Sequence, residues 1–169
     1  MAGPLDSAGA APYVGPGARL LGDVRLAPNS SVFSNAVLRG EADFVEIGPG
    51  ANVQDNCVVE GLVSHPARIG ARVTLGHNAR VYGATIDADA MVAIGATVLP
   101  GAHVGRHTIV AANATVPAGM HVPDGKLVIG QGRILRDVTE AEIARIERGG
   151  IEYVRLSREY LASAISETA

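Results

Sequence analysis

Aliphatic residues recur at every sixth position along most of this chain. The longest uninterrupted run consists of Ile86, Val92, Val98, Val104, Val110, Val116, Val122, Val128 and Ile134. The residue four positions further on is usually small, as at Ala90, Ala96 and Ala102. A period of six fits neither an amphipathic helix nor a half-buried strand, whose periods are about 3.6 and 2. It is typical of a solenoid of short strands and turns.

The same step of six occurs upstream, interrupted by slips in phase. The upstream positions are Val14, Leu20, Leu26, Val32, Leu38 and Phe44, then Ile47, Val53 and Val59, then Ile69, Leu75 and Val81. Three faces of six residues give a coil of about eighteen residues, and stacked coils bury a core that no single unit can bury. We therefore predict an all-β solenoid, a parallel β-helix, over residues 13–136, after an N-terminal extension at 1–12.

The sequence becomes rich in Glu and Arg after residue 134. Thr139 and Glu142 have the spacing of a capping box, which marks the start of a helix. The apolar stripe that follows consists of Ile143, Ile146, Ile151, Val154 and Leu161. We predict a C-terminal α-helix over 137–165 that packs along the β-helix. It is either continuous or hinged at Gly149-Gly150, because each interior glycine costs about 1 kcal/mol of helix stability.

The stretch "VVEGLVSHPARIGARVTLGHNARVYG" interrupts the apolar pattern with a Glu, a His and a Tyr. Winding the chain in coils of eighteen places Glu60 and Tyr82 on one face, in neighbouring coils, about 4.8 Å apart. His77 belongs to the preceding face. Residues 60–68 are additional to the eighteen residues of a coil, so we expect them to form a loop above these side chains.

Composition and charge narrow the classes of function. The net charge of −3 and the lack of any Lys or Arg run give no support to a nucleic-acid partner. No segment reaches the roughly 18 apolar residues that cross a membrane, and the first 14 residues do not resemble a secretion signal. The single cysteine, Cys57, stands at a small-residue position, where we expect it to pack in the core. These features favour a cytoplasmic protein.

Two segments carry a resemblance to a known family. "RGEADFVEIGPGANVQDNCVVE" and "ARIGARVTLGHNARVYGATI" resemble the γ-class carbonic anhydrases, whose bacterial relatives include hexapeptide-repeat transferases. The similarity covers roughly residues 12–165. It implies a left-handed β-helix that forms a homotrimer, with its sites between neighbouring subunits.

The resemblance also implies positions for the family's three zinc-binding histidines. They correspond to Glu60, His77 and Tyr82, so only one of the three is a histidine here. In the family the first and third ligands come from one subunit and the second from its neighbour.

Four further residues match motifs of the family beside this site. Arg39 matches the Arg of its "RGD"-like motif, Glu41 stands where that motif has Asp, and Gln54 and Asp55 match its "QD" segment. We expect these four to bind substrate, with Arg39 holding an anion. The alternative is that these residues only form contacts between subunits.

The replaced ligands change the chemistry that we expect. Catalytic zinc commonly takes three His, or two His and a Glu, and a phenol with a pKa of about 10 is a poor ligand. We therefore expect no metal or other cofactor. Glu60, His77 and Tyr82 together offer a base and a proton donor, the groups needed for acid/base chemistry of a hydrolase, lyase or isomerase type. A small carboxylate or an acyl thioester is the expected substrate.

Three alternatives stay open. The first is a scaffold or binding protein in which Glu60, Tyr82 and His77 only hold an interface. The second is a divergent zinc carbonic anhydrase, with His65 of the loop as a replacement ligand. The third is a hexapeptide acyltransferase with His77 as its base. The other histidines, His103, His107 and His121, are expected at the surface. The chain contains no motif of a serine hydrolase, P-loop NTPase or dinucleotide-binding protein.

Overall fold

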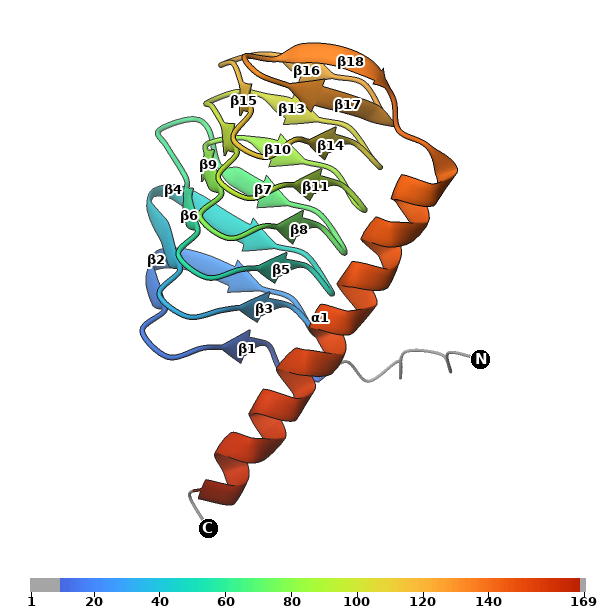
Figure 1. Cartoon of the computed structure of the whole chain (residues 1–169). Coiled ribbons are helices and arrows are strands. Elements are labelled where there is room, and N and C mark those ends of the chain that lie inside the picture. The colour runs from blue at the N-terminus through green and yellow to red at the C-terminus, as the bar shows by residue number, and fades with distance from the viewer. Residues whose placement is uncertain (1–9, 168–169) are drawn as a thin grey trace.

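The computed structural model describes residues 10–167 and shows a parallel β-solenoid of about six turns with one long helix along its side (Figure 1). The predicted left-handed β-helix of hexapeptide repeats is confirmed. Residues 1–9 of the predicted N-terminal extension lie outside the described residues, and residues 10–12 have no regular structure. The first strand begins at Tyr13, as expected.

The strands stack in three faces. The first face contains β1 (Tyr13–Val14), β3 (Ser31–Val32), β5 (Asn52–Val53), β8 (Thr74–Leu75), β11 (Met91–Val92), β14 (Ile109–Val110) and β17 (Lys126–Ile129). The second contains β6 (Val58–Glu60), β9 (Arg80–Tyr82), β12 (Thr97–Val98) and β15 (Thr115–Val116). The third contains β7 (Ala67–Ile69), β10 (Thr85–Ile86), β13 (His103–Val104) and β16 (His121–Val122). The long strands β2 (Arg19–Leu26) and β4 (Val37–Ile47) run over the second and third faces and join them.

The core is a column of stacked aliphatic residues inside the solenoid. Val53 pairs with Leu75 and Val92 pairs with Val110 in parallel register, and all four side chains are fully buried. The small residues at the fourth position of the repeats, such as Ala96, are buried beside them. The period of six in the sequence therefore corresponds to the inward positions of the coils, and burial of this column is the main source of stability.

The turns between strands rely on residues in the left-handed backbone region. Five of the non-glycine residues with positive φ are asparagines, with φ near +60°: Asn29, Asn35, Asn56, Asn78 and Asn113. Asparagine enters this region at less cost than bulkier residues. The recurrent Asn and Gly residues of the sequence thus occupy the turns at the corners of the coil.

Four positions of the period of six do not face the core as expected. Val14 and Leu20, in the first coil, are 43% and 38% exposed. Phe44 is only partly buried and lies outside the coil between Arg25 and Arg68, whose guanidinium carbons are 4.2 and 4.5 Å from the ring centre. Val45 takes its inward place. Ile134 is 41% exposed, because β18 (Arg133–Asp137) folds back antiparallel to β17 and ends the coil. The β-helix predicted to extend to 136 therefore ends with β17.

The helix α1 (Glu140–Glu167) is continuous, so the alternative of a hinge at Gly149-Gly150 is wrong. Its predicted capping box is confirmed: the backbone N–H of Glu142 donates to Thr139 Oγ1 at 3.3 Å, and the backbone N–H of Thr139 donates to Glu142 Oε2 at 2.9 Å. Of the predicted apolar stripe, Ile146 and Val154 are buried, whereas Ile151 is 54% exposed.

Helix α1 runs along the first face, from the last rungs past β1 (Figure 1), and contacts β1, β3 and β5. Contacts between aromatic rings attach the second half of α1 to the first coils of the solenoid. Tyr153 and Tyr160 pack on Phe33, with ring centres 5.5 and 6.4 Å away, and Tyr160 also packs on Tyr13. No helix within the described residues is long and apolar enough to cross a membrane.

Candidate functional site

Glu60 and Tyr82 lie side by side, as the sequence predicts. Glu60 ends β6 and Tyr82 ends β9, and the two residues are direct partners in the parallel register of these strands. Arg39 of β4 is the partner of Glu60 on the other side. An arginine, a carboxylate and a phenol therefore follow one another on three successive rungs of the second face.

The loop expected above these residues is present. The chain leaves the coil at Gly61, where a Cβ atom would lie 2.1 Å from the backbone oxygen of Asp43, so only glycine allows this approach. Leu62 and His65 close the loop by exchanging backbone hydrogen bonds of 2.8 and 2.7 Å. His65 then crosses directly over Gly83, the residue after Tyr82. The side chain of His65 is exposed.

Arg39 and Glu41 form a surface ion pair, with 3.0 Å between Arg39 Nη1 and Glu41 Oε2. The two side chains are 44% and 60% exposed, so the pair adds little to stability. Arg39 makes no ion pair with Glu60 among the described residues. The guanidinium of Arg39 therefore keeps most of its donors available beside the Glu60–Tyr82 pair.

His77 contacts Asp55 at a different corner of the solenoid. His77 follows β8, Asp55 follows β5, and Nδ1 of the imidazole lies 3.1 Å from Oδ2 of the carboxylate. Both side chains are about 40% exposed. The substrate-binding role expected for Asp55 stays a prediction, and the structure shows its carboxylate next to the imidazole. The contact is short enough for an ion pair, but no hydrogen bond joins the two side chains within the described residues. The Asp55 carboxylate faces Nδ1 of the ring, so Nε2 is the nitrogen left to accept a proton.

A cavity of about 580 Å³ opens beside His77, between the first face and α1. Gln54 also lines it, and its side-chain amide donates to Asn52 Oδ1 at 3.1 Å. The remaining wall is largely apolar and includes Met91 and Ile94. Neither Glu60 nor Tyr82 is among the described residues that line it, so one subunit does not bring all three predicted catalytic residues into one cavity.

Tyr153 of α1 lines the same cavity and was not found by sequence analysis. Burial, assisted by the negative charge of Asp55, raises the pKa of its phenol, so Tyr153 stays protonated at neutral pH. Tyr153 is the neighbour of Val154 in the predicted apolar stripe, which indicates packing only, and no local motif distinguishes it.

The other candidate residues of the sequence lie away from this site. Cys57 is fully buried, and burial raises the pKa of its thiol to about 12, which confirms a packing role. His121 is exposed, whereas His103 and His107 are partly buried; His103 Nε2 lies 2.7 Å from Asp87 Oδ2. Within residues 10–167 of one chain, no three His, Cys, Asp or Glu side chains are grouped so that they could hold a metal ion.

No family model matches the chain, but its similarity to individual known proteins identifies its family. A "Probable carbonic anhydrase" of Methanocaldococcus jannaschii is 44% identical over 142 residues, which cover 83% of this chain and 89% of that protein. The chain belongs to the γ-carbonic anhydrase family.

Other relatives agree with this assignment. The mitochondrial gamma carbonic anhydrase 1 of Arabidopsis thaliana is 37% identical over 89% of this chain. This chain covers only 57% of the length of that plant protein and 55% of the length of the mitochondrial gamma carbonic anhydrase 2 of the same plant. A solved hexapeptide transferase family protein from Anaplasma phagocytophilum is 33% identical, with a TM-score of 0.76 over 90% of this chain and 95% of that one.

Proposed function

We propose that this γ-carbonic anhydrase relative is a homotrimeric, metal-free acid/base catalyst that acts on a small carboxylate or an acyl thioester. Its site would combine Glu60 and Tyr82 of one subunit with His77 of the next. The observation that carries the proposal is the direct pairing of Glu60 with Tyr82 on adjacent strands. These are the two ligand positions that the family resemblance assigns to one subunit.

The position of His77 supports a site that two subunits complete. His77 lines a cavity that Glu60 and Tyr82 do not line, and its side chain is 42% exposed at a corner of the solenoid. An exposed imidazole at a corner can reach a neighbouring molecule. The exposed apolar side chain of Ile94 in the same cavity wall is suited to an interface with a second subunit.

The side chains at the ligand positions do not fit zinc. A carboxylate and an imidazole are good ligands, but the third position offers the phenol of Tyr82. A phenol ligates well only after it loses a proton, and its reference pKa is about 10. In the proposed reaction these residues therefore handle protons themselves and do not hold a metal.

Each residue has a distinct role in the proposed hydrolysis of an acyl thioester. His77, oriented by Asp55, takes a proton from water through Nε2. The water oxygen attacks the carbonyl carbon, the carbon–sulfur bond breaks, and the sulfur leaves as a thiol with the proton of Tyr82. The imidazolium of His77 then returns a proton to the Tyr82 phenolate through solvent, which restores both groups. Arg39 attracts the developing negative charge. Glu60 accepts a hydrogen bond from Tyr82 or from the attacking water.

The test uses chelator-treated protein and a series of short-chain acyl-CoA thioesters, with release of free thiol as the readout. Glu60→Gln, His77→Ala and Tyr82→Phe should each lower the rate at least about 100-fold, the usual contribution of acid/base groups. His121→Ala, an exposed histidine on another face, is the matched control. Circular dichroism and sedimentation should show an unchanged folded trimer. A wild-type protein that turns over none of the thioesters, or variants with full activity, would contradict the proposal.

Acyl transfer is the second candidate function. It is favoured by the 33% identity and nearly full coverage of the hexapeptide transferase family protein. His77 would then remove a proton from an acceptor hydroxyl or amine in place of water. Product analysis with added acceptors separates the two functions, because a hydrolase releases free acid whereas a transferase forms an ester or amide.

A further inference from the structure

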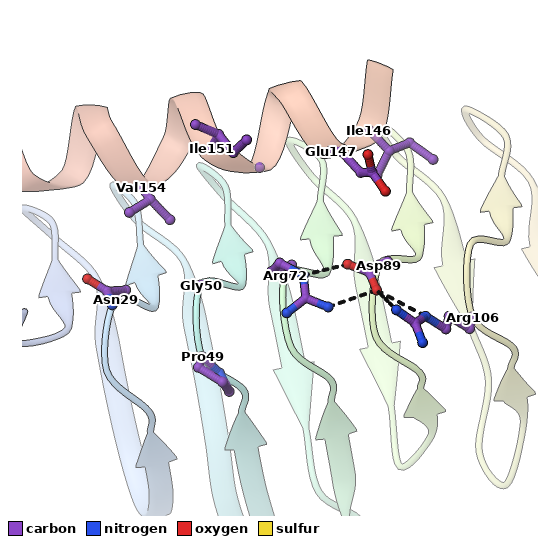
Figure 2. A pocket seen from close by; sticks show the side chains of 11 residues that line it. Asn29, Pro49, Gly50, Arg72, Asp89, Arg106, Ile146, Glu147, Ile151 and Val154 are labelled. Atoms are coloured by element: carbon purple, nitrogen blue, oxygen red, sulfur yellow. Dashed lines mark hydrogen bonds and ion pairs between the residues drawn. The ribbon is translucent and has the colours of Figure 1, made fainter. Parts of the chain in front are cut away.

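A second cavity, which shares Ile146 with the cavity beside His77, lies between α1 and the turns that precede β5, β8, β11 and β14 (Figure 2). Its volume is about 370 Å³. The helix contributes the apolar side chains of Ile146 and Val154, both buried, and of Ile151. This size is at the small end of ligand sites, which range from about 300 to 1,000 Å³.

The solenoid side of this cavity carries a carboxylate between two arginines on three successive turns. Arg72 donates from Nε to Asp89 Oδ1 at 2.6 Å and from Nη2 to Oδ2 at 2.9 Å. Arg106 donates from Nε and Nη2 to Asp89 Oδ2 at 3.1 and 2.9 Å. Figure 2 shows this bridge along the floor of the cavity. Asp89 is buried, whereas both arginine side chains are about half exposed.

This arrangement leaves a net positive charge on the solenoid side. One carboxylate is shared by two guanidinium groups, and His107 Nε2 also lies 3.6 Å from Asp89 Oδ2. Both arginines use only Nε and Nη2 to contact the carboxylate. The Nη1 groups of Arg72 and Arg106 make no hydrogen bond or ion pair within residues 10–167. Each therefore keeps donors that a second carboxylate could accept.

The helix side carries the opposite charge. Glu147 extends from α1 toward the Asp89 bridge (Figure 2), but its carboxylate forms no ion pair with a described residue. Hydrogen bonding to Asp89, with a smaller contribution from the charge of Glu147, raises the pKa of the Arg72 guanidinium. A negative group above and a positive pair below thus face each other across a small space with apolar walls.

We propose that this cavity binds a small aliphatic amino acid. The carboxylate of the ligand contacts the free N–H groups of Arg72 and Arg106, its ammonium group contacts Glu147, and its side chain packs on Ile146 and Val154. A simple carboxylic acid would leave Glu147 without a partner, and a simple amine would leave the arginines without one. Both would therefore bind more weakly than the zwitterion.

Titration calorimetry at pH 7 with three matched probes tests the proposal. Leucine has both charges, 4-methylpentanoate has the same skeleton without the ammonium group, and 3-methylbutylamine lacks the carboxylate. Leucine should bind at least about tenfold more tightly than either analogue. Glu147→Gln should weaken leucine binding by a similar factor and leave 4-methylpentanoate binding unchanged or tighter. Arg106→Met should weaken the binding of both carboxylates.

Glu140→Gln provides the control, because Glu140 is an exposed glutamate at the start of the same helix and outside the cavity. Glu147 is itself exposed, so its replacement should leave thermal stability unchanged. The proposal is overturned if leucine does not bind, if leucine and 4-methylpentanoate bind equally, or if Glu147→Gln has no effect on leucine. Thioester turnover depends on other residues, so this result and the proposed function can fail independently.

Discussion

Glu60 stands beside Tyr82 on the neighbouring parallel strand, where the two residues are direct partners in the register. Their backbones are fixed by the ladder: the N–H of Gly83 donates to the backbone oxygen of Glu60 at 2.7 Å. Because the rung spacing is set by these hydrogen bonds, substitution of either side chain should leave the geometry intact.

Tyr82→His should create a zinc site. The substitution converts the proposed Glu–His–Tyr set into two histidines and a glutamate, a known catalytic zinc ligand set. The variant should therefore purify with about one zinc per subunit, measured by elemental analysis. Glu60→His is the control, because it keeps the phenol and should bind zinc more weakly. Zinc-free Tyr82→His protein after dialysis against zinc would contradict the assigned geometry.

Asp55→Asn should lower thioester turnover at least about tenfold, because the neutral amide lacks the negative charge that stabilises the imidazolium formed when His77 takes a proton. The pH dependence of the rate should shift as well, which a purely structural role would not cause. His103 and Asp87 form a similar contact of 2.7 Å on the third face, away from the site. Asp87→Asn is therefore the matched control and should leave both the rate and its pH dependence unchanged.

Asp89→Asn should destabilise the fold by about 2 kcal/mol at pH 7, because it leaves two guanidinium groups without their buried carboxylate. The arginines hold the pKa of Asp89 below its ordinary value, against the opposing effect of burial. Because the pKa of Asp89 is lower in the folded state, its carboxylate stabilises the fold at pH values above the unfolded-state pKa of about 3.9. This stabilisation is lost as the pH falls through the folded-state pKa.

Urea unfolding of wild type and Asp89→Asn at pH 7, and at a pH below the lowered folded-state pKa of Asp89, measures this difference. The gap between the two proteins should shrink at the lower pH. Asp23→Asn removes an exposed partner of Arg25 and should change nothing measurable at either pH. An equal gap at both pH values would show that the carboxylate charge of Asp89 is not the cause.

Gly149→Ala should stabilise the protein by about 1 kcal/mol, because the residue is inside a continuous helix and an added Cβ meets no atom within 4 Å. Gly132→Ala is the contrasting variant. Its φ of +81° is unfavourable for alanine, and its Cβ would lie 2.6 Å from Pro117 Cδ. Thermal melts should therefore shift upward for the first variant and downward for the second.

The sequence predicts the solenoid well, because burial follows the period of six. It fails where a local turn overrides that period. Ile134 keeps the spacing, but Gly130 and Gly132, both with positive φ, turn the chain back before it. Phe44 keeps the spacing too, yet the long strand β4 has already changed phase, so Val45 faces inward.

Within the site, spacing predicts which residues share a column but not which side chains meet across a corner. Glu60 and Tyr82 follow directly from the coil length. The contact of Asp55 with His77 depends on side-chain directions at two turns, and Tyr153 reaches its cavity only because α1 packs on the first face. The Asp89 bridge links three turns, and no local motif indicates it.

The most direct test of the central claim, a site completed by two subunits, is an activity assay on mixed trimers. Glu60→Gln and His77→Ala proteins, each inactive alone, are unfolded together in equal amounts and refolded. If neighbouring subunits supply Glu60 and His77, about one quarter of the sites regain both residues, and thioester turnover returns to about a quarter of the wild-type rate. A mixture as inactive as its two components would contradict the claim, because it would place both residues in a site within one subunit.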